Sequence, residues 1–217
     1  MNSVFSKTSN IKITNVSREN KTNVPRETFF DKQKYYQHLM NTAFLLKNLR
    51  NVPNFPIPGI KFKDVSTLFN NKECLAEIVD ELVARYKDKG ITKVVGLESR
   101  GFVIGAIVAS RLNCGFVMCR KPGKLPASTI KETYGKEYGT DTLEIHTDAI
   151  TPDDTVLIHD DLLATGGSML AAYNLVGKFN PKDIYMNCII ELKIEGLDGR
   201  TFIGEDKNLD TLLVINE

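Results

Sequence analysis

The sequence predicts an α/β protein in which a parallel β-sheet is flanked by helices. Short apolar runs rich in β-branched residues alternate with amphipathic stretches of helical length, which is the pattern of repeated β-α-β units. Small polar loops connect two of these runs to the helices that follow, at residues 98–100 and 164–168. Because ligands of such sheets bind at the carboxyl ends of the strands, the two loops mark the expected site.

The predicted elements follow a polar N-terminal extension. Residues 1–34 are rich in Asn, Ser, Thr and Lys and show no sustained periodicity, so we expect a poorly ordered extension before one domain over residues 35–217. Glu19 and Glu27 interrupt this extension, and it has no amphipathic arginine face. A targeting peptide is therefore the less favoured alternative.

Helices and strands alternate along the domain. The periodicity predicts helices over residues 35–49, 75–89 and 101–112 and after Ser168, and strands over residues 93–97, 116–119, 156–159 and 183–190. Residues 127–146 have a β-favouring composition around Gly135 and Gly139, which indicates a two-stranded flap that projects from the sheet. Such a flap can close over a substrate and exclude water.

Composition limits the classes of ligand. The 28 Lys and Arg residues against 27 Asp and Glu give a net charge of +1, so no global basic field favours nucleic acid or an anionic membrane. No apolar run approaches the roughly 20 residues that span a bilayer. The four cysteines lie in apolar contexts without a C-x-x-C pair, which predicts reduced thiols in a cytoplasmic protein and no zinc site: Cys74, Cys114, Cys119 and Cys188.

The run from Val156 to Ser168 carries the most specific signal. An apolar strand ends at Asp160 and Asp161, and a loop of small residues then precedes a helix. Glycine permits a sharp turn close to an anion, and free N–H groups at a helix start donate to phosphate. We name this loop the phosphate loop; it consists of Ala164, Thr165, Gly166, Gly167 and Ser168.

Two carboxylates before a phosphate loop suit a sugar phosphate such as ribose 5-phosphate, because carboxylates accept hydrogen bonds from vicinal hydroxyls. The loop has no lysine beside its Ser or Thr, which argues against a nucleoside triphosphate loop. The alternative is a solvated Asp-Asp turn followed by a Gly-Gly helix cap. His159 stands at the last strand position before the acids, where we expect a buried imidazole with its hydrogen bonds satisfied.

Two further segments can bind anions. Glu98, Ser99 and Arg100 follow a strand and precede a helix, so they form a candidate diphosphate loop, although such a loop alone is more often an ordinary helix start. Residues 120–124, which we name the cation segment, carry Arg120, Lys121 and Lys124. These cations can stabilise a departing diphosphate; a basic surface turn is the alternative.

Residues 55–64 form the last informative segment. Their prolines and Gly59 exclude a helix and favour a rigid, extended arm that lines a ligand. Phe62 in this arm can stack on a flat base, and a packed linker is the alternative reading.

Together these segments resemble the type I phosphoribosyltransferases, and among them the adenine phosphoribosyltransferases. The motifs FPIPGIKFKD, GLESRGF, RKPGKLP, KEYG and DDLLATGGS occur in this order over roughly residues 50–200. The resemblance implies the type I fold and transfer of the phosphoribosyl group of phosphoribosyl pyrophosphate to N9 of adenine, giving AMP and pyrophosphate. It also implies magnesium bound mainly through phosphoribosyl pyrophosphate, with no dedicated protein metal site, and a homodimer. The alternatives are a type I enzyme for another base and a non-catalytic sensor of phosphoribosyl pyrophosphate.

The resemblance also implies roles for single residues. Asp160 and Asp161 would hold the ribose hydroxyls, the phosphate loop the 5-phosphate, and the diphosphate loop with the cation segment the pyrophosphate. Arg100, Glu137 and Tyr138 would be catalytic: Glu137 as the acid–base residue near the purine, with Tyr138 closing the hood. Adenine would lie between Phe62 and Leu162, with its edge read by backbone groups of Lys61 and Lys63.

Four residues depart from the family pattern. Lys61 and His159 stand where apolar residues are usual, Lys63 replaces the usual arginine, and Glu98 replaces the commoner aspartate. Recognition by backbone groups survives the change to Lys63, but a side-chain arginine contact does not, because lysine lacks the planar fork.

Overall fold

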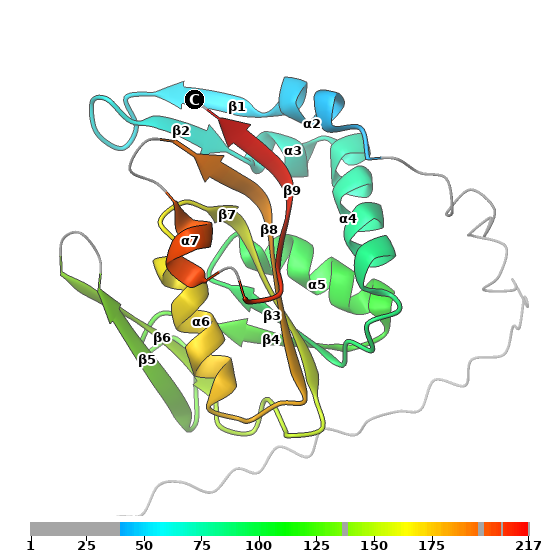
Figure 1. The fold of residues 1–217 in the computed structure, drawn as a ribbon, viewed down its shortest axis with the longest axis vertical. Helices are drawn as coiled ribbons and strands as arrows, with labels where there is room; N and C mark the ends of the chain where they lie inside the picture. Colours follow the sequence, from blue (N-terminus) through cyan, green and yellow to red (C-terminus); the bar gives the residue numbers. More distant parts are fainter. Residues whose placement is uncertain (1–39, 136–138, 195–197, 205, 217) are drawn as a thin grey trace, which may run out of the picture. The chain divides into compact units, whose positions relative to one another are not determined.

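A five-stranded sheet forms the centre of the molecule (Figure 1). The computed structural model describes residues 40–135, 139–194, 198–204 and 206–216, all of which belong to the compact unit His38–Glu217. The strand order is β4-β3-β7-β8-β9, and each neighbouring pair is parallel. Helices α4 and α5 cover one face and α6 lies on the other (Figure 1). The predicted α/β class is confirmed.

The elements of the central layers have the following bounds. The strands are β3 (Lys93–Leu97), β4 (Gly115–Cys119), β7 (Thr155–Leu163), β8 (Asp183–Lys193) and β9 (Leu209–Asn216). The helices are α2 (Thr42–Asn48), α3 (Ser66–Asn70), α4 (Lys72–Tyr86), α5 (Gly101–Leu112), α6 (Gly167–Gly177) and α7 (Gly199–Ile203). Two antiparallel hairpins complete the fold: β1 (Arg50–Pro53) with β2 (Lys61–Asp64), and β5 (Thr129–Gly135) with β6 (Thr140–His146).

Asparagine side chains cap the starts of two helices. Helix α4 begins three residues earlier than predicted because the Asn71 side chain accepts hydrogen bonds from the N–H groups of Glu73 and Cys74, at 3.0 and 3.1 Å. Of the predicted helix over residues 35–49, residues 35–39 lie outside the described residues, and helix α2 occupies Thr42–Asn48 with Asn41 as its cap. The apolar spacing predicted which face of each helix is buried, whereas the asparagine caps determine where the helices start.

Strand β7 is longer than predicted, and this changes the place of the two acids. It runs on through Asp160 and Asp161 to Leu163, with neighbours β3 and β8 on either side. Pairing with β8 holds the backbone extended beyond Asp160, as far as Glu191 opposite Leu163. The prediction that the strand ends at the acids was wrong, and the acids lie in its last part.

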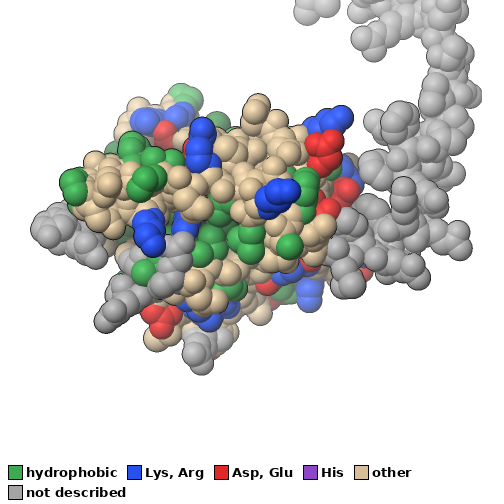
Figure 2. Space-filling view, turned by 90° about the horizontal axis from the view of Figure 1, so that it is seen from above, with side chains coloured by type: hydrophobic (Ala, Val, Ile, Leu, Met, Phe, Trp, Pro, Cys, Tyr) green, Lys and Arg blue, Asp and Glu red, His purple; other side chains and the backbone are tan. Residues whose placement is uncertain are grey.

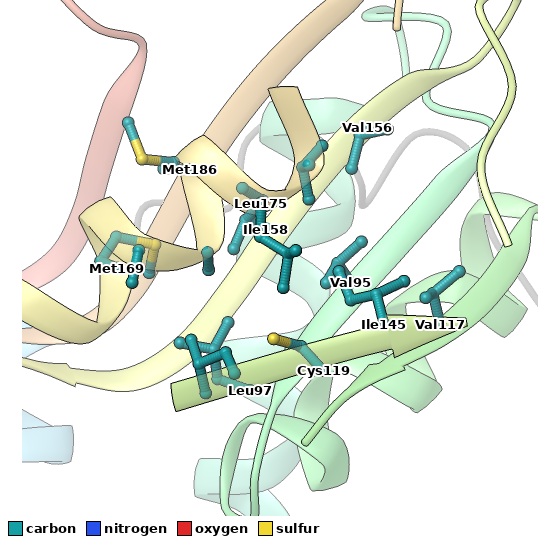
Figure 3. Packing of buried hydrophobic residues seen from close by; sticks show 14 of the residues in the cluster. Val95, Leu97, Val117, Cys119, Ile145, Val156, Ile158, Met169, Leu175 and Met186 are labelled. Atoms are coloured by element: carbon teal, nitrogen blue, oxygen red, sulfur yellow. The ribbon is translucent and has the colours of Figure 1, made fainter. Parts of the chain in front are cut away.

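The main core lies between the sheet and helix α6 (Figure 3). Val95, Leu97 and Ile158 from the strands pack with Leu175 from α6, and each is at most 2% exposed. Burial of such side chains contributes about 1.5–3 kcal/mol each. The core thereby fixes β3, β7 and α6, whose ends carry the diphosphate loop and the phosphate loop.

Both hairpins lie outside the central sheet. Residues 55–64 were predicted as an extended arm; they form part of a loop and strand β2, which pairs with β1. The predicted flap is confirmed as hairpin β5–β6, and it rests on α6 rather than standing free. Lys178 of α6 forms an ion pair with Glu132 at 2.7 Å and donates a hydrogen bond to the Lys131 carbonyl at 2.5 Å.

The surface and the thiols agree with the compositional argument. On the face seen in Figure 2, Lys and Arg side chains are scattered among apolar and uncharged ones rather than gathered in one patch. Cys74, Cys119 and Cys188 are buried, Cys114 is partly buried, and all four are free thiols. No helix in the described ranges is long and apolar enough to cross a membrane.

Candidate active site

The phosphate loop follows the central strand β7. Strand β7 ends at Leu163 and helix α6 begins at Gly167, so the loop connects a buried strand to a helix start. Gly166 is the N-cap residue with φ of +83°, a conformation that favours glycine. Within the described residues no side chain caps this helix, so its first N–H groups are available to an anion.

Asp160 and Asp161 lie just before this loop in a low-dielectric environment. Asp161 is 3% exposed, and its backbone N–H donates a hydrogen bond to Asp160 Oδ1 at 2.9 Å. Burial raises the pKa of Asp160, and the negative charge of Asp161 raises it further. Burial also raises the pKa of Asp161, although the Arg100 guanidinium opposes that shift. Burial therefore disfavours full ionisation of this pair of carboxyl groups, and both can form hydrogen bonds with hydroxyl groups.

The diphosphate loop lies beside the cation segment. Glu98 accepts hydrogen bonds from Arg120 at 3.1 and 3.2 Å, from the Lys121 backbone N–H at 3.1 Å, and from Lys124 at 2.8 Å. These bonds, led by that from Arg120, lower the pKa of Glu98 to about 2. Glu98 is therefore ionised at neutral pH and gathers the Arg120 and Lys124 side chains around its carboxylate. Ser99 lies in the turn before α5.

Arg100 joins three parts of the site. Its Nε lies 2.9 Å from Asp161 Oδ2, which connects the start of α5 to the acids of β7. Its guanidinium stands 5.4 Å from the centre of the Phe62 ring, within the range of a cation–π contact. Phe62 also packs edge-on against Phe55, with ring centres 5.1 Å apart. The arm that carries Phe62 is thus in contact with the sugar-phosphate part of the site.

The two lysines of strand β2 differ in environment. Lys63 is 3% exposed, and its Nζ donates a hydrogen bond to Asn51 Oδ1 at 2.8 Å. Lys61 is exposed and pairs in register with Pro53 of β1. The Lys63 side chain is engaged with its own hairpin, which leaves backbone groups for ligand recognition. Leu162 lies within β7, half-buried. Glu137 and Tyr138 lie outside the described residues.

Two residues of the flap, Tyr134 and Asp141, were not predicted as site residues or as partners. The Tyr134 hydroxyl lies 3.0 Å from Ser168 Oγ and donates a hydrogen bond to Asp141 at 3.3 Å. Asp141 in turn forms an ion pair with Lys121 of the cation segment. The flap therefore connects the phosphate loop to the cation segment. The sequence placed Tyr134 in the flap, but no local pattern indicates which residue its hydroxyl meets.

Comparison with known proteins identifies the family. The model of the phosphoribosyl transferase domain matches residues 64–202. An adenine phosphoribosyltransferase of Phocaeicola vulgatus is 60% identical over 176 residues, which is 81% of this chain and 100% of the relative. One of Bacteroides thetaiotaomicron is 55% identical over 177 residues, 82% of this chain and 99% of the relative. The chain belongs to the adenine phosphoribosyltransferase family.

Solved structures of the family agree with the fold. An adenine phosphoribosyltransferase from Rhodothermus marinus has a TM-score of 0.75 at 44% identity, covering 80% of this chain and 98% of that one. The enzyme from Giardia lamblia complexed with 9-deazaadenine has a TM-score of 0.76 at 41% identity, covering 82% and 100%. The two anion loops and the flap described above therefore belong to a phosphoribosyltransferase fold.

His159, which departs from the family pattern, is buried in this fold with one of its two nitrogens bonded. It is 1% exposed, and its Nδ1 lies 3.2 Å from Asn187 Oδ1. Because the Asn187 amide nitrogen donates to the Asp210 carbonyl, Asn187 Oδ1 accepts and His159 Nδ1 carries the proton. His159 Nε2 has no hydrogen-bond partner among the described residues. The expectation that both ring nitrogens form hydrogen bonds is therefore met only for Nδ1. Burial lowers the pKa of His159 to about 4, which keeps it neutral.

Metal-binding side chains do not gather in this part of the chain. Within residues 40–135, 139–194, 198–204 and 206–216, no three His, Cys, Asp or Glu side chains are placed to hold a metal ion together. The oxygen donors at the site are the carboxylates of Asp160 and Asp161 at the end of β7. This donor set suits a hard, hydrated cation that takes most of its other ligands from a substrate.

Proposed function

We propose that this chain transfers the 5-phosphoribosyl group of phosphoribosyl pyrophosphate to N9 of adenine, giving AMP and pyrophosphate in purine salvage. The observation that carries the proposal is the pairing of two anion loops on adjacent strands. The diphosphate loop follows β3 and the phosphate loop follows β7, and Arg100 connects them through Asp161. A substrate with a phosphate at one end and a diphosphate at the other fits this arrangement.

The phosphate loop and the acids hold the ribose 5-phosphate half. The first N–H groups of α6 and the hydroxyls of Thr165 and Ser168 donate to the 5-phosphate, because no side chain of the described residues caps this helix. Asp160 and Asp161 accept hydrogen bonds from the ribose hydroxyls. Hydrogen bonds from the hydroxyls stabilise the ionised form of these carboxyl groups, whose burial otherwise raises their pKa.

The diphosphate loop and the cation segment hold the leaving group. Ser99 and Arg100 donate to the diphosphate, and Arg120, Lys121 and Lys124 stabilise the negative charge that grows on it as the glycosidic bond breaks. Glu98 holds Arg120 and Lys124 in place before substrate arrives, and Asp141 holds the Lys121 side chain. The positive charge that develops on the ribose lies near the carboxyl groups of β7.

Adenine occupies the side of the site that faces the β1–β2 arm. Phe62 and Leu162 contact the faces of the purine, and backbone groups of Lys61 and Lys63 bind its amino-pyrimidine edge. Arg100 is already close to the Phe62 ring, which places the purine arm near the sugar. Glu137 acts as the acid–base residue near the imidazole nitrogens of the purine, and Tyr138 closes the flap over the purine.

Magnesium is bound mainly through the diphosphate of phosphoribosyl pyrophosphate. The residues present fit this, because Asp160 and Asp161 at the end of β7 supply carboxyl oxygens, the ligand type that magnesium prefers. The ion, when bound, neutralises charge on the leaving pyrophosphate. Asp160 and Asp161 orient the ribose hydroxyls, and Arg100 positions Asp161 for that contact.

The chain works in the cytoplasm as a homodimer on two small molecules, adenine and phosphoribosyl pyrophosphate, without nucleic acid or membrane. Strand β4 is an edge strand of the sheet, and Met118 on it is 41% exposed. Val103 on the adjacent helix α5 is 43% exposed. An apolar edge of this kind supports pairing with a second copy, which light scattering of the purified protein measures.

A base-specificity assay tests the proposal. The protein is incubated with magnesium, phosphoribosyl pyrophosphate and, in turn, adenine, hypoxanthine, guanine, xanthine or orotate. We expect AMP from adenine and little product from the other bases, and a double variant Asp160→Asn with Asp161→Asn serves as the inactive control. A folded protein that makes no AMP contradicts the proposal. Product from another base indicates a different type I enzyme, and binding of phosphoribosyl pyrophosphate without any product indicates a sensor.

A further inference from the structure

Helix α7 takes no part in the proposed chemistry, yet its first residue touches the phosphate loop. A Cβ atom at Gly199 would lie 2.5 Å from the Ala164 carbonyl oxygen and 2.9 Å from Gly166 N. A Cβ atom at Gly166 would lie 2.6 Å from the Gly199 carbonyl oxygen. Real Cβ atoms do not approach backbone atoms this closely, so the two backbones are in direct contact without a side chain between them.

The two glycines serve this contact for different reasons. Gly166 has a φ of +83°, so its backbone conformation alone favours glycine. Gly199 has no positive φ, and its conformation is open to other residues. Only the close approach of the phosphate loop demands glycine at position 199, which points to a function of the contact itself.

An ion pair between Arg200 and the buried Glu191 fixes α7 in this position. The Arg200 guanidinium donates to Glu191 of β8 at 3.0 and 2.6 Å, and Glu191 is 3% exposed. Arg200 also donates to the Leu209 carbonyl of β9 at 2.9 Å. Thr211 of β9 donates to the same Glu191 carboxylate at 2.8 Å. Arg200 therefore holds α7 against two strands of the central sheet.

We propose that Gly199, held by the Arg200–Glu191 ion pair, is a positioning residue for the phosphate loop. The loop has no charged side chain, so its affinity for a phosphate depends on the direction of its N–H groups. The Gly199 backbone limits where the loop backbone can lie. Arg200 acts on the ligand only through Gly199. The inference rests on the proposed function in that the loop binds the 5-phosphate of the substrate.

Arg85 provides a matched control for Arg200. It belongs to α4 and forms an ion pair with Asp210 of β9 at 2.5 Å, and it donates to the Thr211 carbonyl at 3.3 Å. The exposed fractions of the two arginine side chains are similar, 30% for Arg85 and 32% for Arg200. Arg85 thus holds the same segment of β9 but belongs to a helix on the other face of the sheet.

Calorimetric titration of full-length variants tests the proposal. Ribose 5-phosphate and inorganic pyrophosphate are titrated separately into the wild type and into Gly199→Ala, Arg200→Met and Arg85→Met. We expect Gly199→Ala to weaken ribose 5-phosphate binding about tenfold or more, since displacing a binding group by about 1 Å is costly. Arg200→Met should weaken it severalfold, and neither variant should change pyrophosphate binding. In turnover, the KM for phosphoribosyl pyrophosphate should rise while that for adenine stays constant.

Several results would overturn the proposal. Unchanged ribose 5-phosphate binding in Gly199→Ala would do so, as would a wild type that does not bind this ligand. Equal losses of affinity for ribose 5-phosphate and for pyrophosphate would show a merely structural role. Equal effects of Arg200→Met and Arg85→Met on ribose 5-phosphate binding would show the same. If Gly199→Ala does not fold, Arg200→Met against Arg85→Met decides the question. Absence of AMP formation by the wild type contradicts the proposed function alone, and the titrations still decide this inference.

Discussion

The diphosphate loop and the phosphate loop lie on adjacent strands but bind anions with different groups. Around the diphosphate loop, Glu98 is bonded to Arg120 and Lys124, and its pKa is lowered to about 2. The phosphate loop contains no charged side chain, and its geometry depends on Gly166 and on the contact with Gly199. One loop therefore works through charges held in an ion-pair network, and the other through the position of its backbone.

This difference suits the two ends of the proposed substrate. The leaving diphosphate gains negative charge in the transition state, so positively charged side chains held beside it are useful there. The 5-phosphate does not change charge, and its task is to hold the ribose in place. A rigid backbone site is adequate for that. A substitution in one loop should therefore weaken the binding of one ligand and leave that of the other unchanged.

We expect the largest effect from a methyl group in the phosphate loop. Gly166→Ala places a Cβ 2.6 Å from the Gly199 carbonyl and puts alanine at a φ of +83°. Ribose 5-phosphate binding should weaken about 100-fold, because the N–H groups are displaced. The ratio of the variant's dissociation constant for ribose 5-phosphate to that of the wild type should be the same at low and high salt. Gly177→Ala, in the same helix with open space around it, is the control. Wild-type affinity in Gly166→Ala would refute the backbone account.

A second effect concerns the strand between the two loops. His159 has a pKa of about 4 in the folded protein against 6.5 when unperturbed, so the unfolded chain binds the extra proton as the pH falls below 6.5. Stability is therefore lost on going from pH 6.5 toward pH 4. Between about pH 7 and about pH 4.5 the wild type should lose about 2 kcal/mol more than His159→Gln, which keeps an N–H donor for Asn187. Urea unfolding at both pH values measures this, and parallel losses would show that His159 is not the titrating group.

Salt should change the effect of a substitution in the cation segment, unlike the effect of Gly166→Ala in the phosphate loop. Arg120→Met removes one charged donor from the Glu98 cluster, and pyrophosphate binding should weaken about tenfold at low salt. The difference should shrink at high salt because the lost interaction is screened. Arg111→Met is the matched control, since Arg111 is paired with Asp80 at 2.9 Å and has a similar exposed fraction. An Arg120→Met effect that does not depend on salt would contradict the charge account.

The smallest effect should come from the residue that connects the two regions. Tyr134→Phe removes the hydroxyl that lies 3.0 Å from Ser168 Oγ and 3.3 Å from Asp141. Loss of such hydrogen bonds should weaken ribose 5-phosphate binding about fourfold. The same titration on Tyr173→Phe in α6 is the comparison. If Tyr134→Phe binds both ligands as the wild type does, the flap does not couple the two loops.

Local sequence patterns predicted the elements that carry the site. The bounds of β3 and α5 agree with the predicted residues 93–97 and 101–112, because an apolar run and helical spacing are local properties. Strand β7 was predicted too short, since its extension depends on pairing with β8. Helix α7 and strand β9 were not predicted at all. Helix α7 has only five residues, and both elements are held by tertiary contacts, such as the Arg200–Glu191 pair and the bond from Arg200 to the Leu209 carbonyl.

The sequence indicated which residues belong to the candidate site but not which of them are in contact. The motifs indicated the phosphate loop, the acids and the cation segment, yet they did not show that Glu98 binds the cations or that Tyr134 meets Ser168. The need for glycine at position 199 arises from a residue 35 positions earlier in the chain, Ala164. Contacts over such separations leave no trace in local periodicity.

Affinity for phosphoribosyl pyrophosphate tests most directly whether the two loops hold the two ends of one substrate. Calorimetric titration of the wild type, Gly166→Ala, Arg120→Met and the double variant gives four dissociation constants. We predict that each single variant weakens binding of phosphoribosyl pyrophosphate and that the two losses of binding free energy add in the double variant. Wild-type affinity in either single variant would contradict the account.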